Sequence, residues 1–198
     1  PARPTRPSPA PAAAPVAADP EAAKAAAAAL ADCELEENRA CVAKHLDLDA
    51  KARDLFGARY EAAVDADRGA TRTMLLDLFM AAGPSLRRRH FKGGVGAWQV
   101  ASADADRAVV LEEGDGLRLE YLVVRGAAGW RVEDRIRIKG AHRADPKVLV
   151  EKFLRDFEKD SGRGATLADI NEKLPAFVGS HRARTLRIPG KGRKRSRQ

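Results

Sequence analysis

The chain has 198 residues, a length that suits one domain with tails. It carries 36 Lys and Arg against 28 Asp and Glu, but eight of the basic residues and none of the acidic ones lie from His181 onward, so residues 1–180 are balanced in charge. The basic character therefore belongs to the C-terminal end and does not argue that the folded part binds nucleic acid. No run of 18 apolar residues occurs, which excludes a membrane-spanning helix.

The two ends of the chain differ in composition from its middle. Residues 1–19 are rich in Pro and Ala without a hydrophobic period, which predicts an unstructured tether. Residues 179–198 predict a disordered basic tail, and residues 20–178 a single α+β domain. An Ala/Pro tether commonly follows a cleaved export signal, and the chain begins with Pro1, so we expect an exported, periplasmic protein.

Helical segments are expected ahead of the strands, marked by capping residues or by helical spacing of apolar side chains. They cover the Ala-rich run after Asp19-Pro20, about 40–46, about 47–65 and about 70–81. Gly83-Pro84 is expected to stop the last of these helices.

Four strands follow, with apolar and polar residues in alternation. They are Val95–Ala101, Arg107–Glu112, Leu117–Val124 and Trp130–Ile138. The five-residue loop Arg125–Gly129 is expected to close a hairpin between the last two.

This alternation predicts a sheet with one dry and one wet face. Leu117, Leu119, Tyr121 and Val123 share the dry face of the third strand. In the fourth strand the dry residues are Trp130, Val132, Ile136 and Ile138, and the wet ones are Arg131, Glu133, Arg135, Arg137 and Lys139.

Asp134 breaks this rule, because it falls among the apolar set of the fourth strand. It is either a buried carboxylate held by Arg or backbone donors, or it is turned outward by a β-bulge. A catalytic acid would need a base nearby, and His90 is the obvious partner. Because no Gly-rich phosphate loop or nucleophile–His pair stands out, we expect that the protein is not an enzyme.

The C-terminal part is expected to return to helix. Asp145-Pro146 begins one helix, Thr166 caps a short one that runs to Leu174, and Pro175 ends it. Helices, then a curved antiparallel four-stranded meander, then helices define an α+β, cone-like plan.

Cys33 and Cys41 are the two cysteines of the chain. In one continuous helix they would stand about 12 Å apart, too far for a disulfide. A turn near Glu37-Asn38 would allow the bridge, so both states remain open. His45 is the one imidazole nearby and no CxxC motif occurs, so neither a metal nor another cofactor is expected.

Two blocks resemble the MlaC family of periplasmic phospholipid-binding, or toluene-tolerance, proteins over roughly residues 40–175. The helical block resembles the family's F-D-F…M-A-R…A-L-G…W pattern in Leu46-Asp47-Leu48, Ala52-Arg53, Leu55-Phe56-Gly57 and Tyr60. Leu75-Leu76 and Phe79 resemble the family's following F…L-L…Y helix. The hairpin resembles D-Y-R-L…G-W-K-V-Y-D, with Glu120–Val124 and Gly129–Asp134. Lys51, Tyr60 and Glu133 depart from the pattern.

The resemblance implies a phospholipid ligand whose acyl chains lie between the sheet and the helices. It also implies partners, namely an inner-membrane ABC transporter complex and an outer-membrane lipoprotein. Removing two acyl chains from water is worth on the order of 20 kcal/mol before ordering costs, so such a site needs an apolar lining and no catalytic motif. The candidate lining residues are Leu48, Leu55, Phe56, Tyr60, Leu76, Phe79, Trp98, Val100, Leu119, Tyr121, Trp130, Val132 and Ile136. The alternative for each of them is plain core packing.

A second function rests on the basic tail, which could bind nucleic acid or another anionic surface by counterion release. Aromatic residues are not interleaved among its charges, so it offers no platform for base stacking. The same charges would also attract anionic lipid headgroups at a membrane.

Overall fold

The computed structural model describes residues 18–81, 83–91, 96–139 and 146–186, and it has the predicted α+β fold. The helices are α1 (Pro20–Leu35), α2 (Arg39–His45), α3 (Leu48–Phe56), α4 (Ala58–Glu61), α5 (Asp65–Met80), α6 (Gly83–His90), α7 (Pro146–Ser161) and α8 (Leu167–Leu186). The strands β1 (Ala97–Ala103), β2 (Arg107–Gly114), β3 (Leu117–Gly126) and β4 (Gly129–Lys139) form one antiparallel sheet in the order β1-β2-β3-β4. In the described residues no helix is long and apolar enough to cross a membrane.

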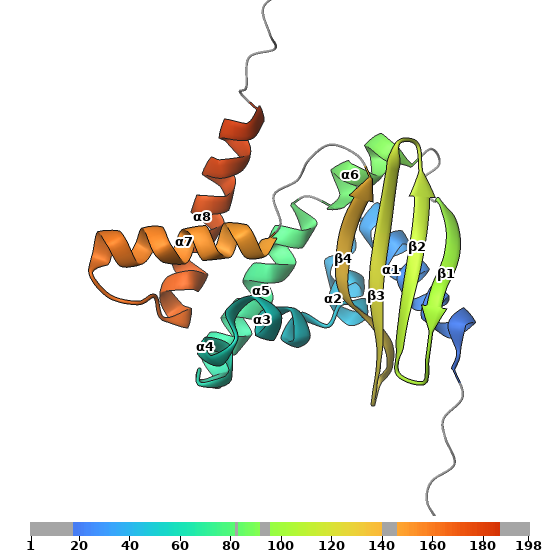
Figure 1. The fold of residues 1–198 in the computed structure, drawn as a ribbon, viewed down its shortest axis with the longest axis horizontal. Coiled ribbons are helices and arrows are strands. Elements are labelled where there is room, and N and C mark those ends of the chain that lie inside the picture. The colour runs from blue at the N-terminus through green and yellow to red at the C-terminus, as the bar shows by residue number, and fades with distance from the viewer. Residues whose placement is uncertain (1–17, 82, 92–95, 140–145, 187–198) are drawn as a thin grey trace, which may run out of the picture.

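The molecule has a sheet half and a helical half (Figure 1). Helix α1 lies along one face of the sheet, and α3, α4, α5, α7 and α8 stand beside its β4 edge. The predicted tether falls almost wholly outside the described residues, as do the predicted start of the first strand at Val95 and the capping residue Asp145.

Helix α1 begins as the sequence predicts, because Asp19 Oδ1 accepts a hydrogen bond from the Ala22 amide at 3.0 Å and Pro20 occupies the first turn. Its small side chains allow it to lie close to the sheet, and Ala23, Ala27 and Leu30 are fully buried there. Three- and four-residue spacing places them on one face of the helix.

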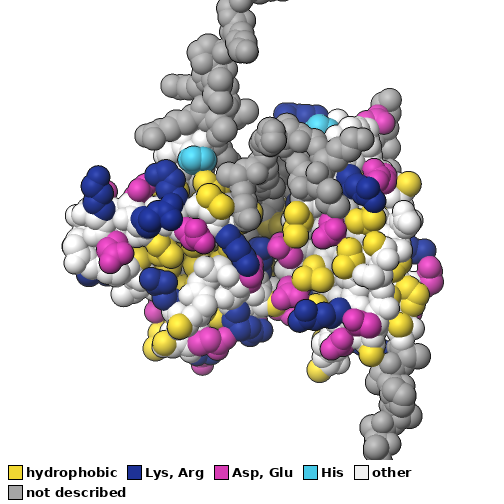
Figure 2. Space-filling view, viewed as in Figure 1, with side chains coloured by type: hydrophobic (Ala, Val, Ile, Leu, Met, Phe, Trp, Pro, Cys, Tyr) yellow, Lys and Arg dark blue, Asp and Glu magenta, His cyan; other side chains and the backbone are white. Residues whose placement is uncertain are grey.

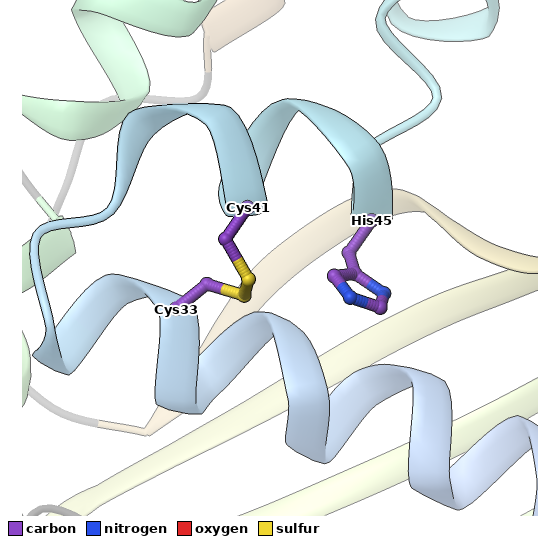
Figure 3. A group of neighbouring side chains, drawn as sticks. All are labelled: Cys33, Cys41 and His45. Atoms are coloured by element: carbon purple, nitrogen blue, oxygen red, sulfur yellow. A yellow bond between two sulfur atoms is a disulfide. The ribbon is translucent and has the colours of Figure 1, made fainter.

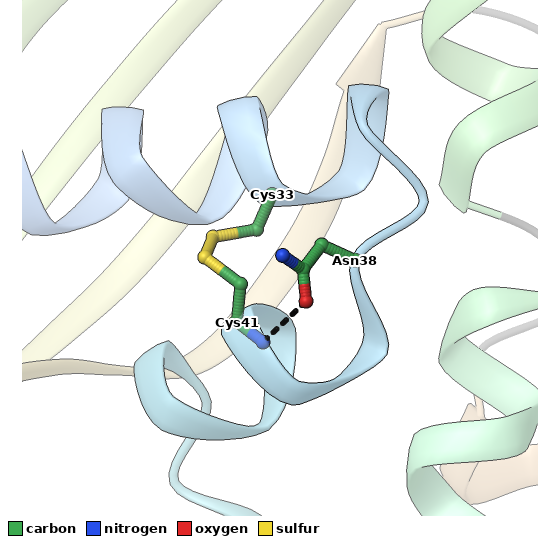
Figure 4. Close-up of a disulfide and its surroundings, with 3 residues drawn as sticks. All are labelled: Cys33, Asn38 and Cys41. Atoms are coloured by element: carbon green, nitrogen blue, oxygen red, sulfur yellow. Dashed lines mark hydrogen bonds between the residues drawn. A yellow bond between two sulfur atoms is a disulfide. The ribbon is translucent and has the colours of Figure 1, made fainter.

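The chain reverses direction between α1 and α2. Glu37 adopts a left-handed conformation at φ 53°, and the Asn38 amide donates to the Cys33 carbonyl at 2.9 Å. Asn38 then caps α2 through its side chain, which accepts from the Cys41 amide at 3.0 Å (Figure 4). The turn brings the Cα atoms of Cys33 and Cys41 to 5.5 Å, and the two residues form a disulfide.

Gly57 and Gly83 both lie at helix boundaries. The expected single helix to about residue 65 is divided at Gly57, which has φ 52° and separates α3 from α4. Helix α5 ends at Met80, just before the predicted stop at Gly83-Pro84, and the same pair begins α6, a helix that was not predicted. Proline suits a first helical turn, because the amide it lacks would have no partner there.

The last two strands are longer than predicted, and their turn is shorter. β3 and β4 extend to Gly126 and Gly129, which pair with each other, so two residues connect the strands in place of five. Gly129 takes φ 100°, a conformation open to glycine at little cost.

A β-bulge in β4 changes the face of the residues that follow it, up to a second register shift between Arg137 and Lys139. Val123 pairs with Val132, but the next pair is Leu122 with Asp134, so Glu133 is the extra residue. Because the side-chain period of a strand is two, one extra residue exchanges the faces.

The predicted faces of Arg135 and Ile136 are therefore wrong. Arg135 pairs with Tyr121 and points to the covered side, whereas Ile136 is 49% exposed on the outer side. Asp134 is also turned outward, which confirms the second of its two interpretations. The Lys51 ammonium from α3 holds this carboxylate at 2.7 Å.

Helix α8 does not end at Pro175, as predicted, but continues through it to Leu186, past the point where the basic tail was expected to begin. Proline removes one helical hydrogen bond. Ile170, Leu174 and Val178 lie on both sides of it at four-residue spacing and are buried in the helical half. Their shared packing carries the helix through the proline.

The described residues bury two separate hydrophobic clusters. The sheet core joins the inner face of the sheet to α1, α2 and part of α5. The helical core joins α3, α4, α5, α7 and α8. Helix α5 contributes to both, since Leu75 lies in the helical core and Leu76 in the sheet core. Leu48, at the start of α3, also packs against both.

Candidate functional site

A pocket of about 380 Å³ lies in the seam between the two cores. Helices α2, α3 and α5 and strand β4 supply its lining, which is Ala43, Leu48, Asp49, Gly69, Arg72, Thr73, Leu76 and Arg131. Its volume is within the range of about 300–1,000 Å³ that small-molecule sites occupy, near the lower end. The apolar part of the lining includes Leu48 and Leu76, the residues through which the pocket meets the sheet core.

Arg131 brings a positive charge to this pocket from β4. Its guanidinium donates to the Ala43 carbonyl at 3.3 Å and to the Leu46 carbonyl, at the C-terminal end of α2. Cations are favoured at that end of a helix. Among the described residues no carboxylate lies within ion-pair distance of Arg131, so its charge is available to an anion in the pocket.

A second arginine reaches the pocket from α5 and is already paired. Arg72 donates to Asp49 Oδ1 at 2.9 Å, and the Tyr60 hydroxyl donates to the same oxygen. Burial raises the pKa of Asp49, but the hydrogen bonds from Tyr60 and Arg72 outweigh it, so the pKa lies below its ordinary value of 3.8. With Asp49 ionised, the two arginines leave the lining with one net positive charge.

Two of the thirteen predicted lining residues, Leu48 and Leu76, line this pocket. The rest are distributed over the two cores and the surface. Phe56 and Tyr60 are buried in the helical core, and Leu55 packs against it. Leu119, Tyr121 and Val132 are buried in the sheet core, and Phe79, Trp98, Val100 and Trp130 pack against that core. Ile136 is exposed on the outer face of the sheet.

The space under the sheet is occupied by side chains of the protein. Leu119, Tyr121 and Val132 are at most 1% exposed, and α1 covers them. The pocket therefore lies beside the β4 edge and not between the sheet and α1. The polar lining residues Asp49, Arg72 and Arg131 were missed, because no sequence pattern brings α3, α5 and β4 together.

A cluster of charged side chains is buried inside the sheet core. Arg87, from α6, donates to Glu34 at 2.9 Å and to both carboxylate oxygens of Glu112, at 2.8 and 2.7 Å. The Tyr121 hydroxyl donates to Glu112 at 2.6 Å, and Arg135 donates to Glu34 at 2.5 Å. Two arginines and two glutamates make the cluster neutral overall.

The partners in this cluster keep Arg87 charged. Burial lowers the pKa of Arg87, but the hydrogen bonds that Arg87 donates to Glu112 and the charges of its neighbours raise it above its ordinary value. Burial also raises the pKa of Tyr121, so its hydroxyl stays protonated and can donate. These groups are enclosed, since Arg87, Glu34 and Glu112 are all 0% exposed, so we assign the cluster a structural role.

A second pocket, of about 370 Å³, lies on the outer side of the helical half, between α7 and α8. Its lining is Phe153, Asp156, Phe157, Asp160, Ser161, Lys173 and Phe177. None of the predicted lining residues takes part in it. The face of the molecule in Figure 2 shows hydrophobic side chains among mixed charges over both halves, without a large field of one sign among the described residues.

No protein-family model matches this chain, and no curated protein matches it. Among solved structures, the chain is similar to the phospholipid-binding protein from Ralstonia solanacearum, whose structure contains a phospholipid. The TM-score is 0.50 and the sequence identity 14%, over 80% of this chain and 96% of that one. At this identity the similarity shows that the two chains share a fold.

Proposed function

We propose that this protein binds a phospholipid in the seam pocket. The observation that carries the proposal is the composition of that pocket, an apolar wall of Leu48 and Leu76 beside Arg131, which forms no ion pair with a carboxylate in the described part of the chain. A phospholipid has the matching chemistry, because its acyl chains gain about 0.8 kcal/mol per buried methylene and its phosphate is an anion. The fold shared with a protein that contains a phospholipid supports the same ligand class.

The seam is also where the pocket can enlarge for a ligand with two chains. Leu48 and α5 are the points at which the two cores meet, so widening the gap between α3, α5 and β4 separates cores that are packed independently. On the outer side Lys51 and Asp134 hold α3 to β4. Both side chains are partly exposed, and such a pair contributes only about 0.2–1 kcal/mol.

At a finer level, we propose that the protein belongs to the MlaC family and acts in the periplasm. It would carry phospholipid between membranes as the substrate-binding component of an ABC-type lipid transport system. The Cys33–Cys41 disulfide supports an oxidising compartment.

Lipid extraction tests the binding proposal. Natively purified protein, extracted with organic solvent and analysed by mass spectrometry, should release close to one intact diacyl phospholipid per chain. Extracts without lipid contradict the proposal. Lysolipid or free fatty acid in place of intact lipid would instead indicate a hydrolase.

Substitution at Gly69 tests the position of the site. Gly69 lines the seam pocket, and a methyl group there would contact little beyond Arg72, at 3.9 Å, so Gly69→Ala should keep the lipid. Gly69→Phe should fill the pocket and remove most of the lipid. Lys173→Phe places the same ring at the second pocket and should leave the lipid content unchanged. Loss of lipid in Lys173→Phe alone would place the site between α7 and α8.

Transfer between membranes is measured separately. Protein loaded with lipid from labelled donor vesicles should deliver the label to acceptor vesicles in proportion to its concentration, and Gly69→Phe should not. A protein that binds lipid and fails to transfer it would contradict the shuttle and leave the binding proposal standing.

A further inference from the structure

We propose that the Cys33–Cys41 pair, when reduced, forms with His45 a binding site for a thiophilic divalent cation of the Zn²⁺ class. Cys33 lies near the end of α1, and Cys41 and His45 lie on α2. The two sulfur atoms and an imidazole nitrogen all lie within 4.8 Å of one another. It is the one group of three such ligands among the described residues.

The two helices place these ligands on facing surfaces. Cys41 and His45 are four residues apart, so they project from the same side of α2, the side that faces Cys33 on α1 (Figure 3). Asn38 fixes the start of α2 by accepting from the Cys41 amide at 3.0 Å. The backbone that holds the ligands therefore depends on helix caps and not only on the disulfide.

The spacing suits tetrahedral coordination. A Zn–S bond is about 2.3 Å and a Zn–N bond about 2.0 Å, so ligand atoms around one ion stand roughly 3.3–3.8 Å apart. When the disulfide is reduced, the two sulfur atoms can move apart to the separation of ligand atoms around a zinc ion. The Cα atoms of Cys33 and Cys41, 5.5 Å apart, can stay in place as they do so. Three protein ligands leave a fourth position for water, the arrangement of an open zinc site.

The charges also fit a cation held by two thiolates. Lys44 and Arg131 both act on His45 as positive charges, which would repel a bare cation. Two thiolates and a neutral imidazole cancel the charge of a divalent ion, so the assembled complex is neutral beside them. A hard cation such as Mg²⁺ prefers oxygen ligands and would not compete.

The disulfide and the metal site exclude each other. A dithiol reductant supplies two electrons and two protons to the Cys33–Cys41 bond, giving two thiols and an oxidised, cyclic disulfide of the reductant. Binding of the cation then releases the two thiol protons and forms two metal–sulfur bonds. The same residues thus cross-link α1 to α2 in one state and hold a metal between them in the other.

Co²⁺ is the probe, because thiolate ligation gives it an intense near-ultraviolet charge-transfer band and tetrahedral geometry gives visible bands. The full chain, reduced without oxygen, should bind one Co²⁺ with both sets of bands, and Zn²⁺ should displace it. The oxidised protein should show neither. Reduced protein that keeps its helical circular dichroism and binds no Co²⁺ overturns the proposal.

His45→Ala tests the third ligand. Since loss of an outer-sphere partner alone weakens metal affinity by about 10–100-fold, loss of a direct ligand should weaken it by more than about 100-fold. Lys44→Ala, at the neighbouring position of α2, is the matched control and should keep the Co²⁺ spectrum. Equal affinity in His45→Ala and wild type overturns the proposal. Should reduction unfold the chain, stoichiometric Zn²⁺ must restore its helical signal, and failure to do so also overturns it.

Discussion

The sheet core and the helical core are held together by different interactions. The sheet core encloses Arg87 with its two glutamates, and a disulfide ties α1 to α2 beside it. The helical core is built from apolar side chains such as Phe153, Ile170 and Leu174, and the salt bridges around it are partly exposed. The difference indicates that directional interactions, namely the buried ion pairs and the disulfide, fix the geometry of the sheet half. The helical half packs against it with fewer directional constraints, and the candidate pocket lies where they meet.

Removal of Arg87 should have the largest effect. Arg87→Met leaves Glu112 buried without an arginine partner and Glu34 with Arg135 alone, and breaking a buried ion pair in this way costs about 3–5 kcal/mol of unfolding free energy. Urea denaturation measures the loss. Arg88→Met is the matched control, because Arg88 neighbours Arg87 on α6, is 57% exposed and pairs with Glu37 at the surface. A change within about 0.5 kcal/mol is expected there. Equal losses in the two variants would mean that the buried cluster does not hold the sheet half.

Leu174→Ala tests the helical half. Leu174 is 1% exposed, and truncating a buried leucine costs about 2–5 kcal/mol through lost burial and the cavity that remains. Native-state hydrogen exchange shows which helices and strands lose stability in the variant. We expect faster exchange in α5, α7 and α8 and little change in β2 and β3. Uniform acceleration throughout the chain would contradict the division into two independently packed cores.

Removal of the disulfide should have a smaller effect on the sheet half. The bridge joins residues eight apart, and the entropy of closing so short a loop is worth about 2.5 kcal/mol. The double variant Cys33→Ala/Cys41→Ala should lose about that much unfolding free energy. Because Asn38 and the turn at Glu37 still set the start of α2, near-ultraviolet circular dichroism should remain native. Loss of that signal would show that the cross-link is needed to form the α1–α2 pair.

Asp49→Asn should have the smallest effect, and the effect should depend on pH. The pKa of Asp49 is below its ordinary value in the folded protein, so the carboxylate stabilises the fold above about pH 4 and loses that contribution as the pH falls through the depressed pKa. Because the Arg72–Asp49 pair is partly exposed, we expect a cost of at most about 1 kcal/mol at pH 7. Urea denaturation at pH 7, 5 and 3 should show this difference shrinking at the lowest value. Asp32→Asn, at an exposed carboxylate on α1, is the matched control. If the difference in unfolding free energy between wild type and Asp49→Asn grew as the pH fell, it would contradict the lowered pKa of Asp49.

Most of the order of elements could be predicted from the sequence, although α6 was not, and the element boundaries that were predicted wrongly have identifiable causes. The cap at Asp19 and the alternation in Leu117–Val124 are local signals, and the structure confirms both. The end of α8 could not be predicted, because the local preference of Pro175 was outweighed by packing of Ile170, Leu174 and Val178. The bulge at Glu133 also has no local signal beyond the misplaced Asp134.

The sequence by itself determined the α+β class, the four-stranded meander and the positions of most caps, because hydrophobic period and capping chemistry act over a few residues. The tertiary structure alone decided which residues share the pocket, which carboxylates Arg87 neutralises and that Cys33 meets Cys41. Each of these depends on how separate elements approach one another. A one-residue bulge illustrates the reason, because it reverses the faces of Arg135 and Ile136 without changing the pattern from which their faces were predicted.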